Sequence, residues 1–365
     1  MKKKWLFLFG ILVLALLLAG CLERVKAPAD SETEKPADPQ EKKAGVWTAH
    51  FIDVGQGDAT LFETEDYAIL IDTGNWNDTD AVDYLENLGV SKLDIVVGTH
   101  PDSDHIGQLD KIIEQFEVGE VWLSGNVSTS DTFIRALEAV EANGTNYYEP
   151  RTGETFDVGG MAIEVLHPAE VTGKGNEESI SLKLTYKDVS FVMTGDAGVK
   201  EEQEMIDSGA ELDAEILHLG HHGSNTSSGT AFLKTVSPEV AIYSAGIDNS
   251  YGHPHAEVIA AAENAGAEVY GTDVNGTVRI ETDGVSYDVL VEKDGITVEG
   301  KNRCIDINIA SSAELQEIEG IGPALAEAII EARPFKTIDE LDNIKGIGQG
   351  KIDAIKEQGL ACIGG

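Results

Sequence analysis

Four short apolar runs along this sequence end on residue types that bind metal ions, and this repetition constrains the fold more than any other feature. The clearest run, Leu93–Gly98, leads directly into Thr99-His100-Pro101-Asp102-Ser103-Asp104-His105. Such a run is typical of a buried strand, and sites in layered α/β proteins are built where strands end. Two imidazoles and two carboxylates this close together are poorly satisfied without a divalent cation. The segment therefore predicts a metal site; the alternative is a polar surface loop.

The three later runs repeat the pattern in order along the chain. A single histidine after an apolar run is more often a capped structural residue than a ligand, whereas four strand ends in order indicate a site. The later runs and the residues at their ends are Met161–Leu166 with His167, Phe191–Thr194 with Asp196, and Glu215–Leu219 with His221 and His222.

The pattern predicts an α/β fold over residues 46–298, in which two sheets carry helices on their outer faces. A chain of this length usually forms more than one domain, and residues 299–365 have mainly helical signals. Expected strands include Thr48–Val54, Ala68–Ile71, Asp94–Gly98, Glu120–Leu123, Met161–Leu166, Ser179–Tyr186, Phe191–Thr194, Glu215–Leu219, Val240–Ser244 and Thr277–Glu281. Expected helices include Asp80–Leu88, Ile106–Gln115, Thr132–Ala142, Lys200–Asp207, Thr230–Val236 and Glu257–Ala265.

The amino terminus has the composition of an export signal. Three lysines precede the apolar stretch Trp5–Ala19, which is short for a membrane span. The stretch closes on Leu-Ala-Gly-Cys21 and resembles a lipobox, so we expect residues 1–20 to be a lipoprotein signal peptide and Cys21 to carry lipid. The alternative is an uncleaved anchor; either one tethers the body to the outer face of the cell membrane. Residues 21–45 lack apolar periodicity and predict a flexible linker.

Cysteine usage fits an exported protein. Besides Cys21 the chain has Cys304 and Cys362, which bracket its last segment. In an oxidising compartment these two could form a disulfide. The alternative is a pair of buried free thiols.

The net charge of −39 arises from 26 basic and 65 acidic residues. Such a surface repels polyanions at long range, which argues against a general nucleic-acid coat. A salty habitat would screen the repulsion. Residues 301–365 carry seven basic and eleven acidic side chains, so most of the negative charge lies elsewhere.

The order of the metal-binding motifs resembles the metallo-β-lactamase superfamily, whose first motif is His-x-His-x-Asp-His. Here the motif begins at His100 with aspartate in the second histidine's place. That variant, together with the stretches Phe51–Ala59, Ile69–Gly74, His221–Ser224 and Tyr251–His255, resembles the hydrolase domain of the ComEC family of competence proteins. The resemblance implies an αββα sandwich over about 46–292, without the channel helices of that family.

The resemblance also implies two divalent metal ions, manganese or zinc. Asp196 would bridge them, and Asp58 and Asp72 would orient the ligands or the site loops. One of His221 and His222 would be a ligand, with a slight preference for His221, and the other could bind substrate. The implied ligands are His100, Asp102 and His167 for one metal and Asp104, His105 and one histidine of the 221/222 pair for the other.

The expected chemistry is hydrolysis by a metal-activated water, which needs no serine or cysteine nucleophile. Asp104 would belong to the catalytic centre. His253 and His255 follow a Tyr-Gly turn and could donate to a phosphate oxygen or protonate the leaving group. The alternative for this histidine pair is a structural cap at the start of a helix.

The last segment contains Gly320-Ile321-Gly322 and Gly346-Ile347-Gly348, an internal repeat. Glycines allow a close approach to an anion, and free N–H groups of the next helix point at it. The repeat resembles the double helix-hairpin-helix of the ComEA family of DNA receptors, which grip phosphates without reading sequence. Lys345, Lys351 and Lys356 make the second hairpin the better candidate, because Glu317, Glu319, Glu327 and Glu331 surround the first. The alternative is a packing module.

Together these patterns predict an exported, lipid-anchored metallohydrolase with a DNA-binding tail. The leading hypothesis is a phosphodiesterase, and more specifically a nuclease that acts on extracellular DNA. Such a nuclease would serve DNA uptake or scavenging, with a DNA-uptake machinery as its partner. A second hypothesis is hydrolysis of a cell-wall or lipid phosphoester, because a fold alone does not select a substrate. A third is a surface DNA receptor without catalysis.

Overall fold

The computed structural model describes residues 45–293, 305–308, 310–316, 318, 320–358 and 361–363. The predicted signal peptide, almost all of the linker, Cys21, Cys304 and the side chain of Cys362 lie outside the described residues. The lipid anchor and the disulfide therefore stay predictions. In the part of the chain that is described, every helix is too short or too polar for a bilayer crossing.

The first sheet of the described structure has eight strands in the order β15-β14-β1-β2-β3-β4-β5-β6. Neighbours from β3 to β6 pair in parallel, with Ile69 opposite Ile95, and the other pairs are antiparallel. The strands are β1 Trp47–Phe51, β2 Thr60–Glu63, β3 Ala68–Ile71, β4 Lys92–Gly98, β5 Glu117–Leu123, β6 Asn146–Tyr148, β14 Val278–Thr282 and β15 Tyr287–Val291.

The second sheet has seven strands in the order β13-β12-β11-β10-β9-β8-β7. Strands β10 to β13 are parallel, so their carboxyl ends lie at one edge of the sheet. The strands are β7 Thr155–Val158, β8 Met161–His167, β9 Ser181–Tyr186, β10 Val189–Met193, β11 Ile216–His218, β12 Val240–Tyr243 and β13 Glu268–Gly271.

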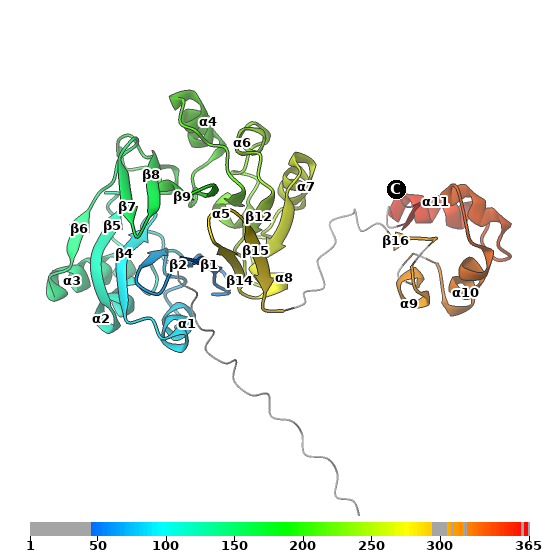
Figure 1. The fold of residues 1–365 in the computed structure, drawn as a ribbon, viewed down its shortest axis with the longest axis horizontal. Coiled ribbons are helices and arrows are strands. Elements are labelled where there is room, and N and C mark those ends of the chain that lie inside the picture. The colour runs from blue at the N-terminus through cyan, green and yellow to red at the C-terminus, as the bar shows by residue number, and fades with distance from the viewer. Residues whose placement is uncertain are drawn as a thin grey trace, which may run out of the picture. The chain divides into compact units, whose positions relative to one another are not determined.

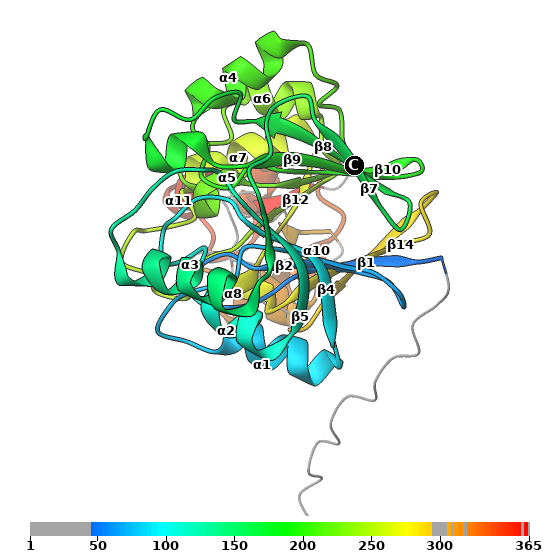
Figure 2. The ribbon, with the colours of Figure 1, turned by 90° about the vertical axis from the view of Figure 1, so that its left-hand side faces the viewer.

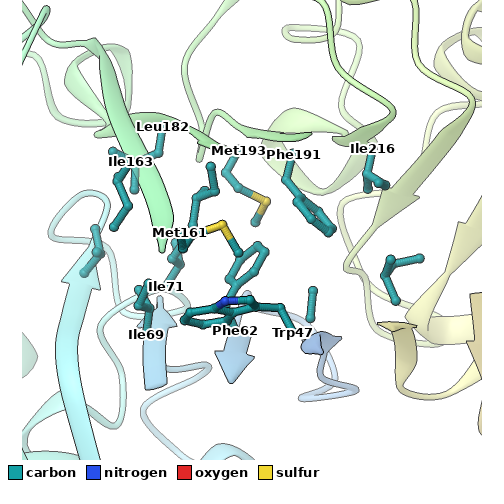
Figure 3. Packing of buried hydrophobic residues seen from close by; sticks show 14 of the residues in the cluster. Trp47, Phe62, Ile69, Ile71, Met161, Ile163, Leu182, Phe191, Met193 and Ile216 are labelled. Atoms are coloured by element: carbon teal, nitrogen blue, oxygen red, sulfur yellow. The ribbon is translucent and has the colours of Figure 1, made fainter. Parts of the chain in front are cut away.

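The main core lies between the two sheets. Figure 3 shows side chains of the first sheet, such as Trp47 and Phe62, pointing toward Met161 and Phe191 of the second. The Phe62 and Phe191 rings meet edge to face with centroids 5.1 Å apart. Burying a side chain of this size stabilises the fold by about 1.5–3 kcal/mol, which fixes the two sheets face to face.

Helices cover the outer face of each sheet, which gives the predicted αββα sandwich (Figures 1 and 2). Leu85 of α1 packs with Leu70 of the first sheet, and Phe232 of α6 packs with Leu217 of the second. The first sheet carries α1 Asp80–Leu88, α2 Leu109–Gln115 and α3 Asp131–Asn143; the second carries α4 Val199–Ser208, α6 Thr230–Val236 and α7 Ala256–Ala265; η1 Gly175–Glu178, α5 Gly220–Gly223 and α8 Thr272–Asn275 are short turns in the connections.

The described residues between 305 and 363 have a small core of their own, formed by side chains such as Leu315, Ile329, Leu341 and Ile352. Pro323 occupies the first turn of α10, where its missing N–H costs nothing. This part is helical, as predicted, apart from one parallel pair of two-residue strands. Its elements are β16 Ile305–Asp306, α9 Ser312–Leu315, α10 Pro323–Ala332, η2 Ile338–Asn343, α11 Gln349–Gln358 and β17 Ala361–Cys362.

Candidate metal centre

Loops from both sheets bring most of the predicted ligands together at one edge of the sandwich. Each loop follows a buried strand, so the packed core fixes where the loop begins. The loop after β4 carries His100, Asp102, Asp104 and His105, the loop after β10 carries Asp196, and the loop after β11 carries His221 and His222.

Asp196 lies at the centre of this cluster and is almost fully buried. Its Oδ2 lies 3.5 Å from His100 Nε2 and 3.4 Å from His221 Nε2, and its Oδ1 lies 3.3 Å from His105 Nε2. One carboxylate thus contacts three imidazoles from two sheets, which is the geometry of a bridging ligand.

The described residues contain two groups of potential metal ligands, and within each group the ligand atoms lie within 4.8 Å of one another. The first group is His100, His105 and Asp196, and the second is Asp58, His105 and His222. The Nε2 atoms of the three histidines and one oxygen of each aspartate are buried, and none makes a good hydrogen bond within the described residues. A buried polar atom left unpaired costs about 1–3 kcal/mol. Five such atoms that converge fit a bound cation.

Asp102 and Asp104 complete the cluster on its more exposed side. Asp104 Oδ2 lies 3.4 Å from His222 Nε2, and Asp102 Oδ2 lies 3.8 Å from His100 Nε2. The Asp102 side chain is half exposed, so this side of the centre is open to solvent. A mixed set of imidazoles and carboxylates suits zinc or manganese.

Asp72 holds His105 in the orientation that a ligand needs. Its Oδ2 accepts from His105 Nδ1 at 2.8 Å, and its Oδ1 accepts from the Thr99 amide at 2.8 Å. Because Nδ1 donates in this bond, Nε2 is the ring nitrogen that faces the cluster and would bind a metal. This is the orienting contact that the sequence predicts for Asp72.

The histidine pair after β11 is anchored in the same way. His222 Nδ1 donates to the Ser244 carbonyl at 2.9 Å, and His221 Nδ1 lies 3.0 Å from the Thr226 hydroxyl. His222 is buried, whereas His221 is partly exposed. Both Nε2 atoms therefore face carboxylates of the cluster, although the sequence predicts only one ligand of the pair.

The loop before β9 supplies two polar side chains that the sequence analysis missed. Ser179 Oγ lies 3.3 Å from His100 Nδ1 and accepts from the Asp196 amide at 3.1 Å. Asn176 donates to Asp196 Oδ2 at 3.0 Å. Their only sequence signal is a polar run directly before a strand, which is common in loops.

His167 contacts a backbone carbonyl in the structure. It ends β8, as expected, but its Nε2 lies 3.0 Å from the Glu177 carbonyl. Within the described residues it belongs to neither group of potential ligand atoms. His221 Nε2, by contrast, lies 3.4 Å from Asp196 Oδ2, the oxygen that His100 also faces.

Three residues of the cluster adopt left-handed backbone conformations that only glycine accepts readily. The φ angles are 58° at Asp72, 53° at His221 and 58° at His222. Each such residue costs about 1–3 kcal/mol, and strain of this kind concentrates at functional sites. The packed strands on both sides hold these residues in place.

Residues 52–247, more than half of the chain, match the family model of the metallo-beta-lactamase superfamily. The chain belongs to this superfamily. With the histidine–carboxylate centre described above, membership makes it a metal-dependent hydrolase, as the sequence predicts. Residues 300–358 match the helix-hairpin-helix motif.

Two proteins similar to this chain cover 62% of it, and a third matches a stretch of 60 residues. ComE operon protein 3 of Bacillus subtilis is 29% identical over 248 residues, which cover 62% of this chain and 32% of that protein. Competence protein ComA of Neisseria gonorrhoeae is 32% identical over 231 residues, which cover 62% and 31%. A deoxyribonuclease of a Thioalkalivibrio species is 48% identical over 60 residues, which cover 16% and 17%. The chain spans about a third of the two competence proteins, and the predicted similarity to this family is confirmed.

Electrostatics in this metallo-beta-lactamase centre couple the buried groups strongly. Burial alone would lower the pKa of His105, but Asp196 and Asp72 outweigh it and raise that pKa well above its usual value. Burial would raise the pKa of Asp196, but His105 and His100 hold it well below the usual range. Burial and the neighbouring His105 lower the pKa of His100. The carboxylates of the centre therefore favour a positive charge beside them.

His253 and His255 border the histidine pair of the superfamily centre. The His253 ring centroid lies 5.6 Å from that of His221 and 6.0 Å from that of His222. Burial and the neighbouring histidines, His222 first, lower the pKa of His253 to about 4. His255 Nδ1 accepts from the Asn225 amide at 3.1 Å, a contact that ties it to the loop after His222.

The helix-hairpin-helix part has the two expected glycine turns. Gly320 and Gly346 have φ angles of 74° and 104°, and Gly322 and Gly348 follow them directly before α10 and α11. In the second hairpin Lys345 is exposed, but Lys351 Nζ donates to the Gly320 carbonyl at 3.0 Å and is tied to the first turn.

Proposed function

We propose that this chain is an exported, lipid-anchored, metal-dependent phosphodiesterase, and more specifically a nuclease that acts on extracellular DNA. The observation that carries the proposal is the convergence, on one edge of the sandwich, of five buried nitrogen and oxygen atoms that make no good hydrogen bond within the described residues. The helix-hairpin-helix match in the same chain favours DNA among the phosphodiesters.

Two divalent metals would share Asp196. On the first side we assign His100, Asp102 and His221, because their atoms lie closest to Asp196 Oδ2 or to His100. This assignment replaces His167 by His221 and also makes His222 a ligand. On the second side we assign Asp104, His105 and His222, with Asp58 as a neighbouring carboxylate.

Bound metals would supply an activated water and stabilise charge on the attacked phosphate. The chain's own residues fix where this happens. Asp72 and Ser244 hold His105 and His222 through their Nδ1 atoms, so the ligands need little rearrangement on binding. His253 stands beside the histidine pair, where a ring N–H could donate to a non-bridging phosphate oxygen.

The tail would hold DNA close to the centre. Support comes from the helix-hairpin-helix match and from the relatives, which include a protein named a deoxyribonuclease and two named for competence. The second glycine turn, Gly346–Gly348, and the exposed Lys345 form the candidate phosphate contact. Anchoring through Cys21 and work beside a DNA-uptake machinery belong to the same proposal.

The test is metal-dependent cleavage of plasmid DNA by the purified protein with Mn²⁺ or Zn²⁺, beside an Asp104→Ala variant. We expect cleavage by the parent and its loss in the variant, because Asp104 faces His222 in the centre. Equal cleavage by both proteins would contradict the proposed centre. A parent protein that binds metal but leaves both plasmid DNA and a single-stranded oligonucleotide intact would point to another phosphodiester.

A further inference from the structure

Two large aromatic side chains are exposed on loops beside the metal centre. Trp76, between β3 and α1, has 53% of its surface exposed, and Tyr251, between β12 and α7, has 65% exposed. Single exposed aromatics are ordinary on a protein surface, but two of them on loops that border the same centre from the two sheets suit the stacking of a flat ligand.

Trp76 is fixed to the loop that carries the first ligands. Its amide donates to the Ser103 carbonyl at 3.0 Å, between Asp102 and Asp104. The preceding Asn75 donates from its side chain to the Gln56 carbonyl at 3.0 Å. These hydrogen bonds hold the backbone at Trp76 in place, and its exposed side chain lies on the side of the centre formed by the first sheet.

Tyr251 is fixed on the second-sheet side. Its ring stacks on His253 with centroids 5.7 Å apart and planes 22° apart, and His253 borders His221 and His222. Asn249 Oδ1 accepts from the Tyr251 amide at 3.2 Å, which braces the loop. A preorganised ring costs little entropy when it binds a flat partner.

Charge gives this surface little attraction for a phosphate backbone. The chain has a net charge of −39, and Trp76 is followed by Asp78, Asp80 and Asp83. A nucleic acid bound here needs a source of affinity other than phosphate neutralisation. Base–aromatic stacking provides one, and it requires bases whose faces are not already covered by a duplex.

We propose that the substrate is single-stranded DNA and that Trp76 and Tyr251 stack on its bases, which positions the intervening backbone at the metal centre. This inference rests on the proposed nuclease function and names its substrate class. Both residues are positioning residues for substrate, presented from loops of the two sheets.

The test compares cleavage of a short oligothymidylate, its blunt duplex with oligodeoxyadenylate, and the small diester methyl p-nitrophenyl phosphate. The proteins are the parent, Trp76→Ala, Tyr251→Ala, Tyr251→Phe and the control Tyr67→Ala. Tyr67 is a matched control because it is 42% exposed and lies at the opposite end of β3 from Asp72.

We expect the parent to prefer the single strand, with a KM that changes little between about 50 and 200 mM salt. Each alanine variant at the rim should raise that KM about tenfold, while Tyr251→Phe and Tyr67→Ala should match the parent. Equal cleavage of duplex and single strand, or unchanged KM in both rim variants, would overturn the inference and leave the nuclease standing. Hydrolysis of the small diester without cleavage of either DNA would overturn the nuclease proposal itself.

Discussion

At the scale of single residues, the centre is explained by how each histidine uses its two nitrogens. His105 and His222 each place Nδ1 on an oxygen, Asp72 Oδ2 and the Ser244 carbonyl, and leave Nε2 toward the carboxylates. Asp196 then faces three imidazoles at 3.3–3.5 Å. Such a buried set is stable when a cation satisfies it, so ligand positioning and metal affinity should depend on one another.

Asp72→Asn should lower metal affinity about 10- to 100-fold, because His105 loses the charged acceptor that orients it and makes it more basic. Metal affinity can be measured by competition with a coloured chelator. Asp94→Asn is the matched control, since Asp94 accepts from the Ala68 amide at the other end of the same strand pair. Equal affinities in both variants would show that Asp72 has no orienting role.

Glu202 predicts a pH dependence of stability that does not involve the metal ligands. Burial raises its pKa to about 7, although the amides of Gly229 and Ser228 donate to it. The folded state therefore keeps this proton between about pH 4.5 and 7 while the unfolded chain has lost it. Its contribution, up to about 3 kcal/mol, is present at low pH and disappears as the pH rises through 7.

The stability of the parent should fall between about pH 5 and about pH 8, a range that includes the pKa of Glu202. Glu202→Gln should make this fall smaller, because glutamine does not titrate. The urea midpoint at each pH measures this. Glu204→Gln, an exposed position on the same helix, is the control and should keep the parent's profile. A Glu202→Gln profile that coincides with the parent's would mean that Glu202 is ionised when folded.

At the scale of elements, the loop after β4 is held by close packing on the loop after β3. A Cβ added to Gly107 would lie 2.2 Å from the Trp76 nitrogen and 2.4 Å from the Gly74 oxygen, both backbone atoms. The glycine thus permits the close approach that places Asp102–His105 beside Asp72.

Gly107→Ala should therefore destabilise the fold by about 1–3 kcal/mol and lower the metal content of the purified protein. Urea unfolding and elemental analysis check the two effects. Gly198→Ala is the control, because its Cβ would meet only the flexible end of Glu201 at 3.1 Å and the Thr226 carbonyl at 3.4 Å. Similar stability of the two variants would contradict the packing argument.

Element prediction from sequence succeeded where burial is complete and failed at the sheet edges. Ala68–Ile71, Asp80–Leu88 and Thr230–Val236 have the bounds that the sequence predicts. Within the two large sheets five strands were missed, and four of them, β6, β7, β13 and β15, are the edges of those sheets; the two-residue strands β16 and β17 were missed as well. Edge strands are half exposed. The remaining strand, β2, has polar residues at both ends and only two apolar residues between them, unlike the fully apolar β3.

Among the predicted elements that are shorter in the structure, two have clear local reasons. The strand expected over Thr48–Val54 ends at Phe51, because the chain then bends through Gly55, whose φ is 65°. The helix expected over Ile106–Gln115 begins at Leu109, because the Ile106 amide closes a turn on the Asp102 carbonyl. Both differences lie at the metal loops, where site geometry overrides local propensity.

The sequence predicted which strand ends form the candidate site, but it did not predict which histidine contacts which carboxylate. Sequence order cannot show that His221 and His222 both take left-handed conformations and both reach carboxylates. Nor can it show that His167 turns to the Glu177 carbonyl. These outcomes depend on how loops from two sheets pack together.

At the scale of the whole molecule, the acidic chain carries a tail that matches the helix-hairpin-helix motif, for which we propose DNA binding. Lys351 and Lys356 are occupied by the Gly320 carbonyl and by Asp339, so Lys345 is the exposed cation at the second glycine turn. Few phosphate contacts are then available, and the tail should bind DNA weakly and with a shallow salt dependence.

Lys345→Glu should weaken binding of a fluorescent duplex by the full chain about three- to tenfold at low salt and reduce the salt slope by about one. Lys336→Glu is the control, an exposed lysine outside the two glycine turns. Fluorescence anisotropy over a salt series measures both quantities. Identical affinities for the two variants would remove the second hairpin as the DNA contact.

The central claim, a two-metal centre that hydrolyses DNA, is tested most directly by adding Mn²⁺ stepwise to chelator-treated protein while the rate of oligonucleotide cleavage is recorded. The account predicts no cleavage without metal and a rate that rises until two equivalents are bound, because Asp196 faces ligand sets on both of its oxygens. Full activity in the metal-free protein, or a rate that no metal restores while two equivalents bind, would contradict it.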